Sequence, residues 1–96
     1  MYASIRRYRI ARSSIDEISK RVQDGFLPII SALPGFVAYY IVDQGDGNAA
    51  TISLFQDKAA ALESNRAAAG WVQENMASLV EGPPQILAGK VVVSSS

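Results

Sequence analysis

Two short apolar stretches flank a polar turn between residues 33 and 57, and this pattern predicts a β-hairpin. Residues 36–42 are apolar at odd and even positions alike, which predicts a strand that is covered on both faces. Residues 44–48 contain two Gly, one Asp and one Asn, which tolerate the positive φ of a hairpin turn. Residues 51–55 are β-branched and apolar, so we expect the antiparallel return strand there.

The segment before this hairpin has the spacing of an amphipathic helix. Its apolar residues recur at steps of three and four, at Ile15, Ile18, Val22, Phe26, Ile29 and Leu33. Ser14 and Glu17 match a capping box, which predicts the start of the helix. Pro28 has no N–H to donate to the carbonyl of Asp24, so we expect a kink or break near Gly25.

A second helical segment follows the hairpin, with Asp57 as its expected N-cap residue. Residues 58–69 are rich in alanine and favour helix strongly. Gly70 interrupts the pattern, and residues 71–80 continue it. If the helix were unbroken, Trp71 would lie opposite the apolar stripe Leu62–Ala69–Met76. Gly70 makes that continuity doubtful, and if the helix restarts after Gly70, Trp71 and Asn75 share an arc that faces the sheet.

Strands are also expected at residues 2–11 and 85–93, so the element order is β-α-β-β-α-β over a single domain, residues 1–96. This order predicts a ferredoxin-like α+β fold, in which an antiparallel four-stranded sheet carries two helices on one face. The second sheet face would then be exposed and apolar. We expect a homodimer that buries this face in a dimeric α/β barrel, with either Tyr39 or Tyr40 at the interface.

Composition excludes several classes of function. The 96 residues include nine Lys and Arg and nine Asp and Glu, and this zero net charge argues against nucleic-acid binding. The absence of His and Cys excludes His-ligated haem or zinc, and nucleophile systems based on these residues. We expect no cofactor and no metal. No apolar run is long enough to span a membrane, and the N-terminus lacks a signal-peptide pattern, so a cytoplasmic protein is expected.

The first strand carries three arginines, Arg6, Arg7 and Arg9. We expect at least two of them to emerge into solvent with their stems on apolar surface. One guanidinium could instead point into a pocket and hold an anionic or phenolate oxygen. The sequence leaves open which arginine does so.

These features together resemble the antibiotic-biosynthesis monooxygenase-like family of dimeric α/β-barrel proteins. The resemblance rests on the Arg- and Tyr-rich first strand, the helix that ends in residues 33–36, the strand at 51–55, Trp71, and the last strand from Pro84. It implies oxidation of an aromatic substrate by O₂ without metal or flavin. Haem-degrading relatives use a Trp, an Asn and a His; this chain has Trp71 and Asn75 but no His, so that type of haem degradation is excluded.

Two functions remain open from the sequence. The first is a cofactor-independent monooxygenase in which Trp71 and Asn75 are catalytic and Arg6, Tyr8 and Phe26 bind a small aromatic substrate. The second is a non-catalytic homodimer that binds a small ligand or has a structural role. For Trp71 we weigh an ordinary position at the rim of the helix against one in an apolar pocket between helices and sheet, with Asn75 as its polar partner.

Overall fold

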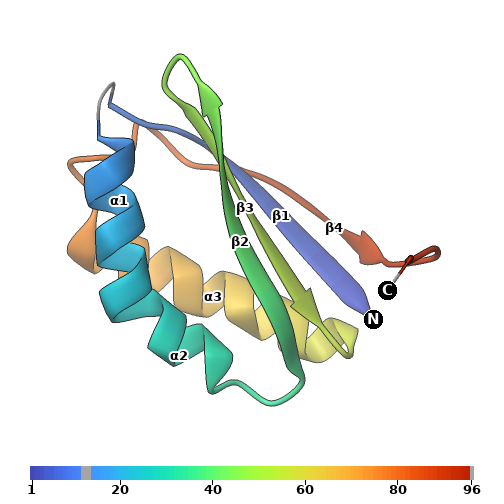
Figure 1. Ribbon diagram of the computed structural model, residues 1–96. Coiled ribbons are helices and arrows are strands. Elements are labelled where there is room, and N and C mark those ends of the chain that lie inside the picture. Colours follow the sequence, from blue (N-terminus) through green and yellow to red (C-terminus); the bar gives the residue numbers. More distant parts are fainter. Residues whose placement is uncertain (12–13, 96) are drawn as a thin grey trace.

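The computed structural model describes residues 1–11 and 14–95 (Figure 1). Its elements follow the expected order: β1 (Tyr2–Arg9), α1 (Ile15–Arg21), a π-helical turn η1 (Val22–Phe26), α2 (Leu27–Ser31), β2 (Phe36–Gly45), β3 (Asn48–Phe55), α3 (Lys58–Asn75) and β4 (Gln85–Lys90). The four strands form one antiparallel sheet in the order β2-β3-β1-β4. The ferredoxin-like α+β fold is thereby confirmed.

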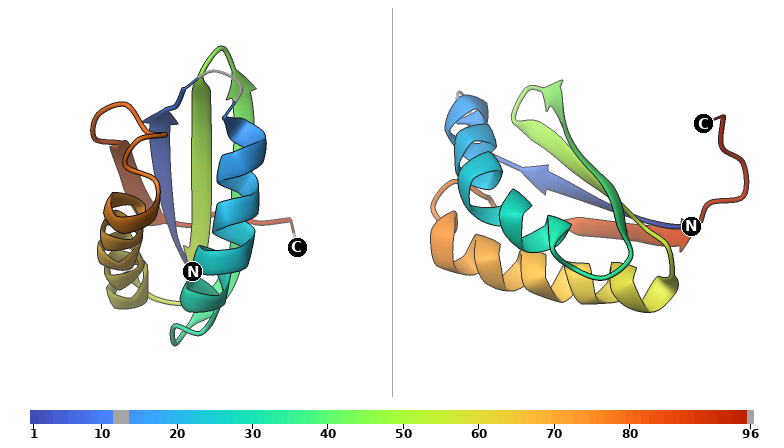
Figure 2. Two further views of the ribbon diagram at one scale, coloured as in Figure 1. Left: turned by 90° about the vertical axis from the view of Figure 1, so that its left-hand side faces the viewer. Right: turned by 60° about the horizontal axis from the view of Figure 1, so that its bottom comes forward.

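All the helices lie on one face of this sheet. Figure 2 shows α1 and α3 side by side over the strands, with the opposite face of the sheet free of helices. The residues of β1 and β3 that point toward the helices are in register across the pair, since Ser4 lies opposite Ser53 and Arg6 opposite Thr51. Within the part of the chain that the structure describes, no helix is long and apolar enough to cross a bilayer.

The first helical region is irregular where the sequence predicts a break. Between α1 and α2 the helix widens into the π-helical turn η1, which contains Gly25. Pro28 is the second residue after this turn, and its missing N–H removes one helical hydrogen bond at this point. The capping box does not form: the Ser14 hydroxyl donates to the Ala11 carbonyl, and Glu17 pairs with Arg21 instead.

Small side chains bring α3 close to the sheet. Ala61, Ser64 and Ala68 are its buried residues, whereas Leu62 of the expected apolar stripe is 44% exposed. The helix also runs through Gly70 without a break, so of the two alternatives the unbroken helix holds and the restart after Gly70 does not occur. Because the inner face of α3 follows the small residues, Trp71, three positions after Ala68, still faces η1 on an unbroken helix.

A bulge near the start of β2 changes which face Phe36 occupies. The register to β3 shifts between Phe36 and Ala38, and the ring of Phe36 packs edge-on against Phe55 on the helix side. The strict alternation that places Phe36 with Ala38 and Tyr40 is therefore wrong at this residue. Beyond the bulge Tyr39 lies toward the helices, and Tyr40 lies on the open face with 54% of its surface exposed.

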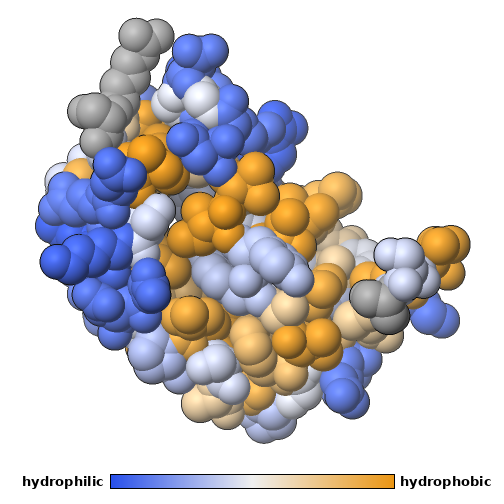
Figure 3. All heavy atoms as spheres, in the orientation of Figure 1, coloured by the Kyte–Doolittle hydropathy of each residue, from blue (hydrophilic) through white to orange (hydrophobic). Residues whose placement is uncertain are grey.

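The open face is broadly apolar, and so is the chain end beside it. Apolar side chains from all four strands point to this side, namely Ala38, Tyr40, Val42, Ala50, Ile52, Leu54, Ala3, Ile5 and Leu87. The strand β4 ends at Lys90, earlier than predicted, and the C-terminal segment after it projects from the body in Figure 2. Val92 and Val93 of this segment are almost fully exposed. In Figure 3 hydrophilic residues gather over α1 and the β2–β3 turn, whereas apolar residues cover β2.

Candidate functional site

The alternation of β1 separates its three arginines. Arg6 points between the sheet and the helices and is only 2% exposed, while Arg7 and Arg9 lie at the opposite face and are exposed. A guanidinium remains charged at every pH that a protein encounters. The first strand therefore places one permanent positive charge in the interior.

Asn65 of α3 fixes the orientation of this guanidinium. The Arg6 Nη1 donates to the Asn65 Oδ1 over 2.6 Å, and the Ser4 hydroxyl donates to the same oxygen over 2.7 Å. Because a guanidinium nitrogen only donates, the amide oxygen has to face Arg6, and the Asn65 Nδ2 is turned away from it. Asn65 therefore belongs to the hydrogen-bonded interior beside Arg6 and not to a fully solvated face of α3.

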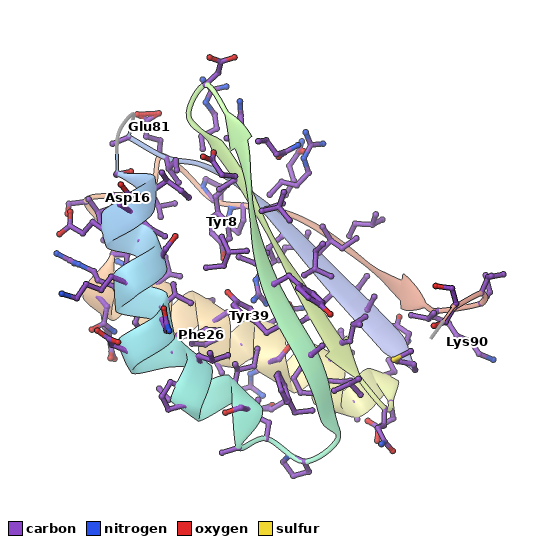
Figure 4. All side chains as sticks on the ribbon, viewed as in Figure 1. Tyr8, Asp16, Phe26, Tyr39, Glu81 and Lys90 are labelled. Atoms are coloured by element: carbon purple, nitrogen blue, oxygen red, sulfur yellow. The ribbon has the colours of Figure 1, made fainter. Side chains whose placement is uncertain are left out.

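Two phenols accompany Arg6 in the interior. Figure 4 shows Tyr8 and Tyr39 pointing from the sheet into the space beneath the helices, with Phe26 facing them from η1. The rings of Phe26 and Tyr39 meet edge-on, with centroids 5.8 Å apart. Burial raises the pKa of Tyr8 and that of Tyr39 above the ordinary value, and the neighbouring Arg6 charge lowers each by a smaller amount. Both phenols are therefore neutral at physiological pH.

Within residues 1–11 and 14–95, the charge of Arg6 consequently has no counter-ion. Among the described residues no carboxylate lies within ion-pair distance of Arg6. Its Nε is buried and has no hydrogen-bond partner in the part of the chain that the structure describes, and the buried hydroxyl of Ser53 likewise has none there. An unpaired buried charge is costly for a fold, so this arrangement indicates a place for an anionic ligand group.

Two adjoining spaces open beside Arg6. One is a cavity of about 30 Å³ between the sheet, η1 and α3, with Phe26, Tyr39, Trp71 and Met76 in its wall. The other is a cleft of about 490 Å³ between α3 and the start of β4, with Asn65 and Ile86 in its wall. The two spaces share the following lining residues: Arg6, Tyr8, Val72 and Val80. The cleft is large enough for a small aromatic molecule, whereas the cavity holds no more than a diatomic or water-sized one.

Trp71 lies against the π-helical turn and separates the cavity from the outer surface. A side-chain carbon on Gly25 would come within 2.9 Å of its indole, and the rings of Trp71 and Phe26 lie 5.5 Å apart. Asn75 does not reach the cavity: its side-chain amide donates to the Trp71 carbonyl over 2.9 Å at an exposed position. The structure thus brings Arg6, Tyr8, Phe26 and Trp71 around one cavity and places Asn75 outside it.

Sequence reasoning did not identify Asn65 and Tyr39 as site residues. One signal could have identified Asn65: it lies one position after the buried Ser64 and three before the buried Ala68, on the flank of the small-residue face of α3. Tyr39 was ambiguous because both faces of its strand are apolar. Among the residues that the structure describes, no group of acidic side chains is placed to hold a metal ion.

Solved structures with this architecture are numerous, although no protein-family model and no curated protein sequence matches the chain. A protein of unknown function from Nitrosomonas europaea superposes with a TM-score of 0.79 at 18% identity, over 99% of this chain and 92% of the other. An antibiotic biosynthesis monooxygenase gives 0.73 at 19% identity, over 97% of this chain and 100% of the other. The chain has the antibiotic-biosynthesis-monooxygenase fold.

The haem-degrading protein MhuD from Mycobacterium tuberculosis, solved with two haems in its active site, has the same fold. It superposes with a TM-score of 0.77 at 15% identity, and the alignment covers 100% of each chain. At these identities the likeness establishes the fold, which hosts different chemistries on one scaffold. The chemistry of this chain therefore has to be argued from its own residues.

Proposed function

We propose that the protein binds the anion of a small hydroxylated aromatic molecule and oxidises it with O₂, without a cofactor. The observation that carries the proposal is Arg6, a buried guanidinium without a carboxylate partner among the described residues. Ionisation makes such an aromatic molecule electron-rich enough to react with O₂, and Arg6 favours the ionised form by its charge. The ring lies in the 490 Å³ cleft that Arg6 lines.

The chemistry balances for a substrate of the anthrone type, which has a CH₂ group conjugated to a carbonyl. Ionisation gives an enolate whose oxygen is held by Arg6. The enolate transfers one electron to O₂, the radical and superoxide combine at the former CH₂ carbon, and the released proton returns to the peroxide. Loss of water then leaves a new carbonyl, so that CH₂ and O₂ become C=O and H₂O.

The candidate residues take the following roles in this proposal. Arg6 binds the enolate oxygen, and the Nδ2 of Asn65 is the second donor at the cleft. Tyr8 lies between the cleft and the cavity as a neutral hydrogen-bond donor. Phe26 and Trp71 form the inner wall of the cavity. Asn75, the catalytic candidate from the sequence, is held at the surface by its hydrogen bond to Trp71, so Asn65 replaces it here.

A second copy of the chain is the proposed cover for the open sheet face. Val42 is 43%, Tyr40 54% and Leu87 67% exposed, and a contiguous exposed apolar surface of this kind marks a site of contact with another protein. The two edge strands, β2 and β4, each have one edge without a neighbouring strand. When two copies stack face to face about a two-fold axis that runs parallel to the strands, β2 of one copy lies over β4 of the other. In that arrangement Arg9 faces the turn residue Asp46 of the second copy, so the charges are complementary.

Oxygen consumption tests the catalytic proposal. An oxygen electrode is used with 1,8-dihydroxy-9-anthrone and related hydroxylated aromatics, and the rate without protein is subtracted. We expect protein-dependent uptake of one O₂ per carbonyl formed, abolished by Arg6→Met and retained by Arg66→Met, which changes an exposed arginine on α3. Binding of these compounds without any uptake would favour the alternative, a non-catalytic homodimer that binds a small ligand.

A further inference from the structure

The cavity behind Arg6 differs from the neighbouring cleft in size and in polarity. Its volume is about 30 Å³, and almost no polar atom faces it although Arg6, Tyr8 and Tyr39 contribute to its wall. Val22 and Met76 in the wall are nearly inaccessible to solvent. A water molecule needs two to four polar partners to be stable in a protein interior, and this cavity does not supply them.

We propose that this cavity is a binding site for molecular oxygen, next to the cleft that takes the aromatic substrate. The inference rests on the proposed function, which requires O₂ as the co-substrate. O₂ is a small uncharged molecule that is more soluble in apolar surroundings than in water, and dry apolar cavities bind comparable guests such as xenon. The size of the cavity suits a diatomic molecule and excludes an aromatic ring.

The position of the cavity suits the electron transfer as well. Arg6, Tyr8, Val72 and Val80 line both spaces, so a guest in the cavity and a ring in the cleft lie on the two sides of one thin partition. The first step of the proposed oxidation turns O₂ into superoxide. A fixed guanidinium beside the cavity stabilises this developing negative charge in a water-poor site.

Dissolved O₂ is its own probe for this site, because it is paramagnetic and speeds the relaxation of nearby protons. Methyl relaxation is measured by NMR on the whole protein, once under O₂ and once under N₂. Val22 and Met76 line the cavity, whereas Ile30 is 0% exposed and is not among the lining residues. We expect a severalfold larger enhancement at Val22 and Met76 than at Ile30. Equal enhancements at all three would overturn the proposal.

A matched pair of substitutions on α3 tests whether the cavity supplies O₂ for the reaction. Ala68 is 2% exposed and lines the cavity, and Ala61 is 0% exposed on the same helix but does not. Ala68→Val fills the cavity, so we expect the O₂ enhancement at Met76 to disappear and the KM for O₂ to rise severalfold. Ala61→Val leaves both unchanged. The dissociation constant of the aromatic ligand stays unchanged in both variants, because the cleft is not altered.

A second variant keeps the test decisive if Ala68→Val fails to fold. Ile41→Val removes one carbon from the cavity wall and enlarges the space, so the O₂ enhancement at Met76 grows. An enhancement that falls or stays constant in this variant would contradict the proposal. The relaxation measurement needs no turnover: cavity-specific relaxation without O₂ uptake would overturn the proposed oxidation alone, and uptake without cavity-specific relaxation would overturn the oxygen site alone.

Discussion

Ile5 and Arg6 are neighbours in β1, yet they point to opposite faces of the sheet. One face lacks an anion that would neutralise its charge, and the other lacks a layer that would cover its apolar side chains. The helix-covered face holds a charge that no anion among the described residues neutralises. The open face holds apolar side chains that no helix covers. An unpaired interior charge favours a small anion, whereas an uncovered apolar face favours a second protein surface. One strand thus carries evidence for two partners of different chemistry.

The open face gives the largest expected effect. Tyr40→Asp places a carboxylate in the centre of the proposed dimer interface, where an unpaired buried charge costs about 3–5 kcal/mol. We expect a homodimer for the wild type and a monomer or an aggregate for this variant, measured by light scattering coupled to gel filtration. Gln44→Asp, near the exposed end of β2 and outside the apolar patch, is the control and remains dimeric. A wild-type chain that is monomeric at micromolar concentration would refute the dimer.

Two glycines test the packing of the covered face. Gly25→Ala forces its new carbon within 2.9 Å of the Trp71 indole, so we expect a loss of about 1–3 kcal/mol in the free energy of unfolding from overpacking. Gly70→Ala meets no atom within 4 Å, and we expect a gain of about 0.5–1 kcal/mol from its higher helix propensity. Urea unfolding monitored by the fluorescence of Trp71, the only tryptophan, measures both. Equal effects of the two substitutions would contradict the close packing of η1 against α3.

Arg6 itself is expected to contribute little to stability. Arg6→Met removes an unpaired charge that is costly to bury, but it leaves the Asn65 oxygen and two phenols with one donor fewer. These terms oppose each other, and we expect a net change between zero and a gain of about 1 kcal/mol. Chemical denaturation measures the change, with Arg66→Met on the outer side of α3, where the side chain is 83% exposed, as the control. A loss comparable to that of a core substitution would show that Arg6 serves the fold and not a ligand.

The smallest expected effect is a change of stability in alkaline solution. Burial raises the pKa of Tyr8 and of Tyr39 in the folded protein above the ordinary value of 10.0. Their contribution to stability is therefore fully present below pH 10.0 and is lost as the pH rises through the folded-state values. The double variant Tyr8→Phe/Tyr39→Phe should lose less stability than the wild type between roughly pH 9 and 11. If the free energy of unfolding depends on pH in the same way in the two proteins, the burial of the two phenols would be contradicted.

The sequence predicts the fold well because its signals are local. The alternation of residues 36–42, the turn at 44–48 and the helical period after Ser14 each depend on nearby residues, and their order allows few topologies. The apolar stripe predicted for α3 is wrong at Leu62, because this larger residue does not occupy the inner position of the helix. In the structure Ala61, Ser64 and Ala68 lie inside, since their small size allows close approach of the helix.

The site was predictable only in part. Arg6 and Tyr8 lie on one face of one strand, so their proximity follows from a period of two. Asn65 is 59 residues away from Arg6, and only the tertiary packing of α3 on β1 brings the two together. The bulge near Phe36 changes the face of a residue without leaving a Gly or Pro at that position as a signal. Long-range contacts and bulges are the features that local patterns do not encode.

The central claim is that Arg6 holds the anionic oxygen of a planar aromatic ligand, and isothermal titration calorimetry tests it most directly. The probes are 2-hydroxy-1,4-naphthoquinone, an enol that is ionised at neutral pH, and its 2-methoxy ether, which has nearly the same shape and no charge. The account predicts saturable binding of the enolate to the wild type, and much weaker binding of the ether. It also predicts that Arg6→Met reduces the affinity for the enolate to that for the ether, whereas Arg66→Met, at an exposed position on α3, does not. Equal affinities of the two compounds for the wild type, or an unchanged affinity for the enolate in Arg6→Met, would contradict the account.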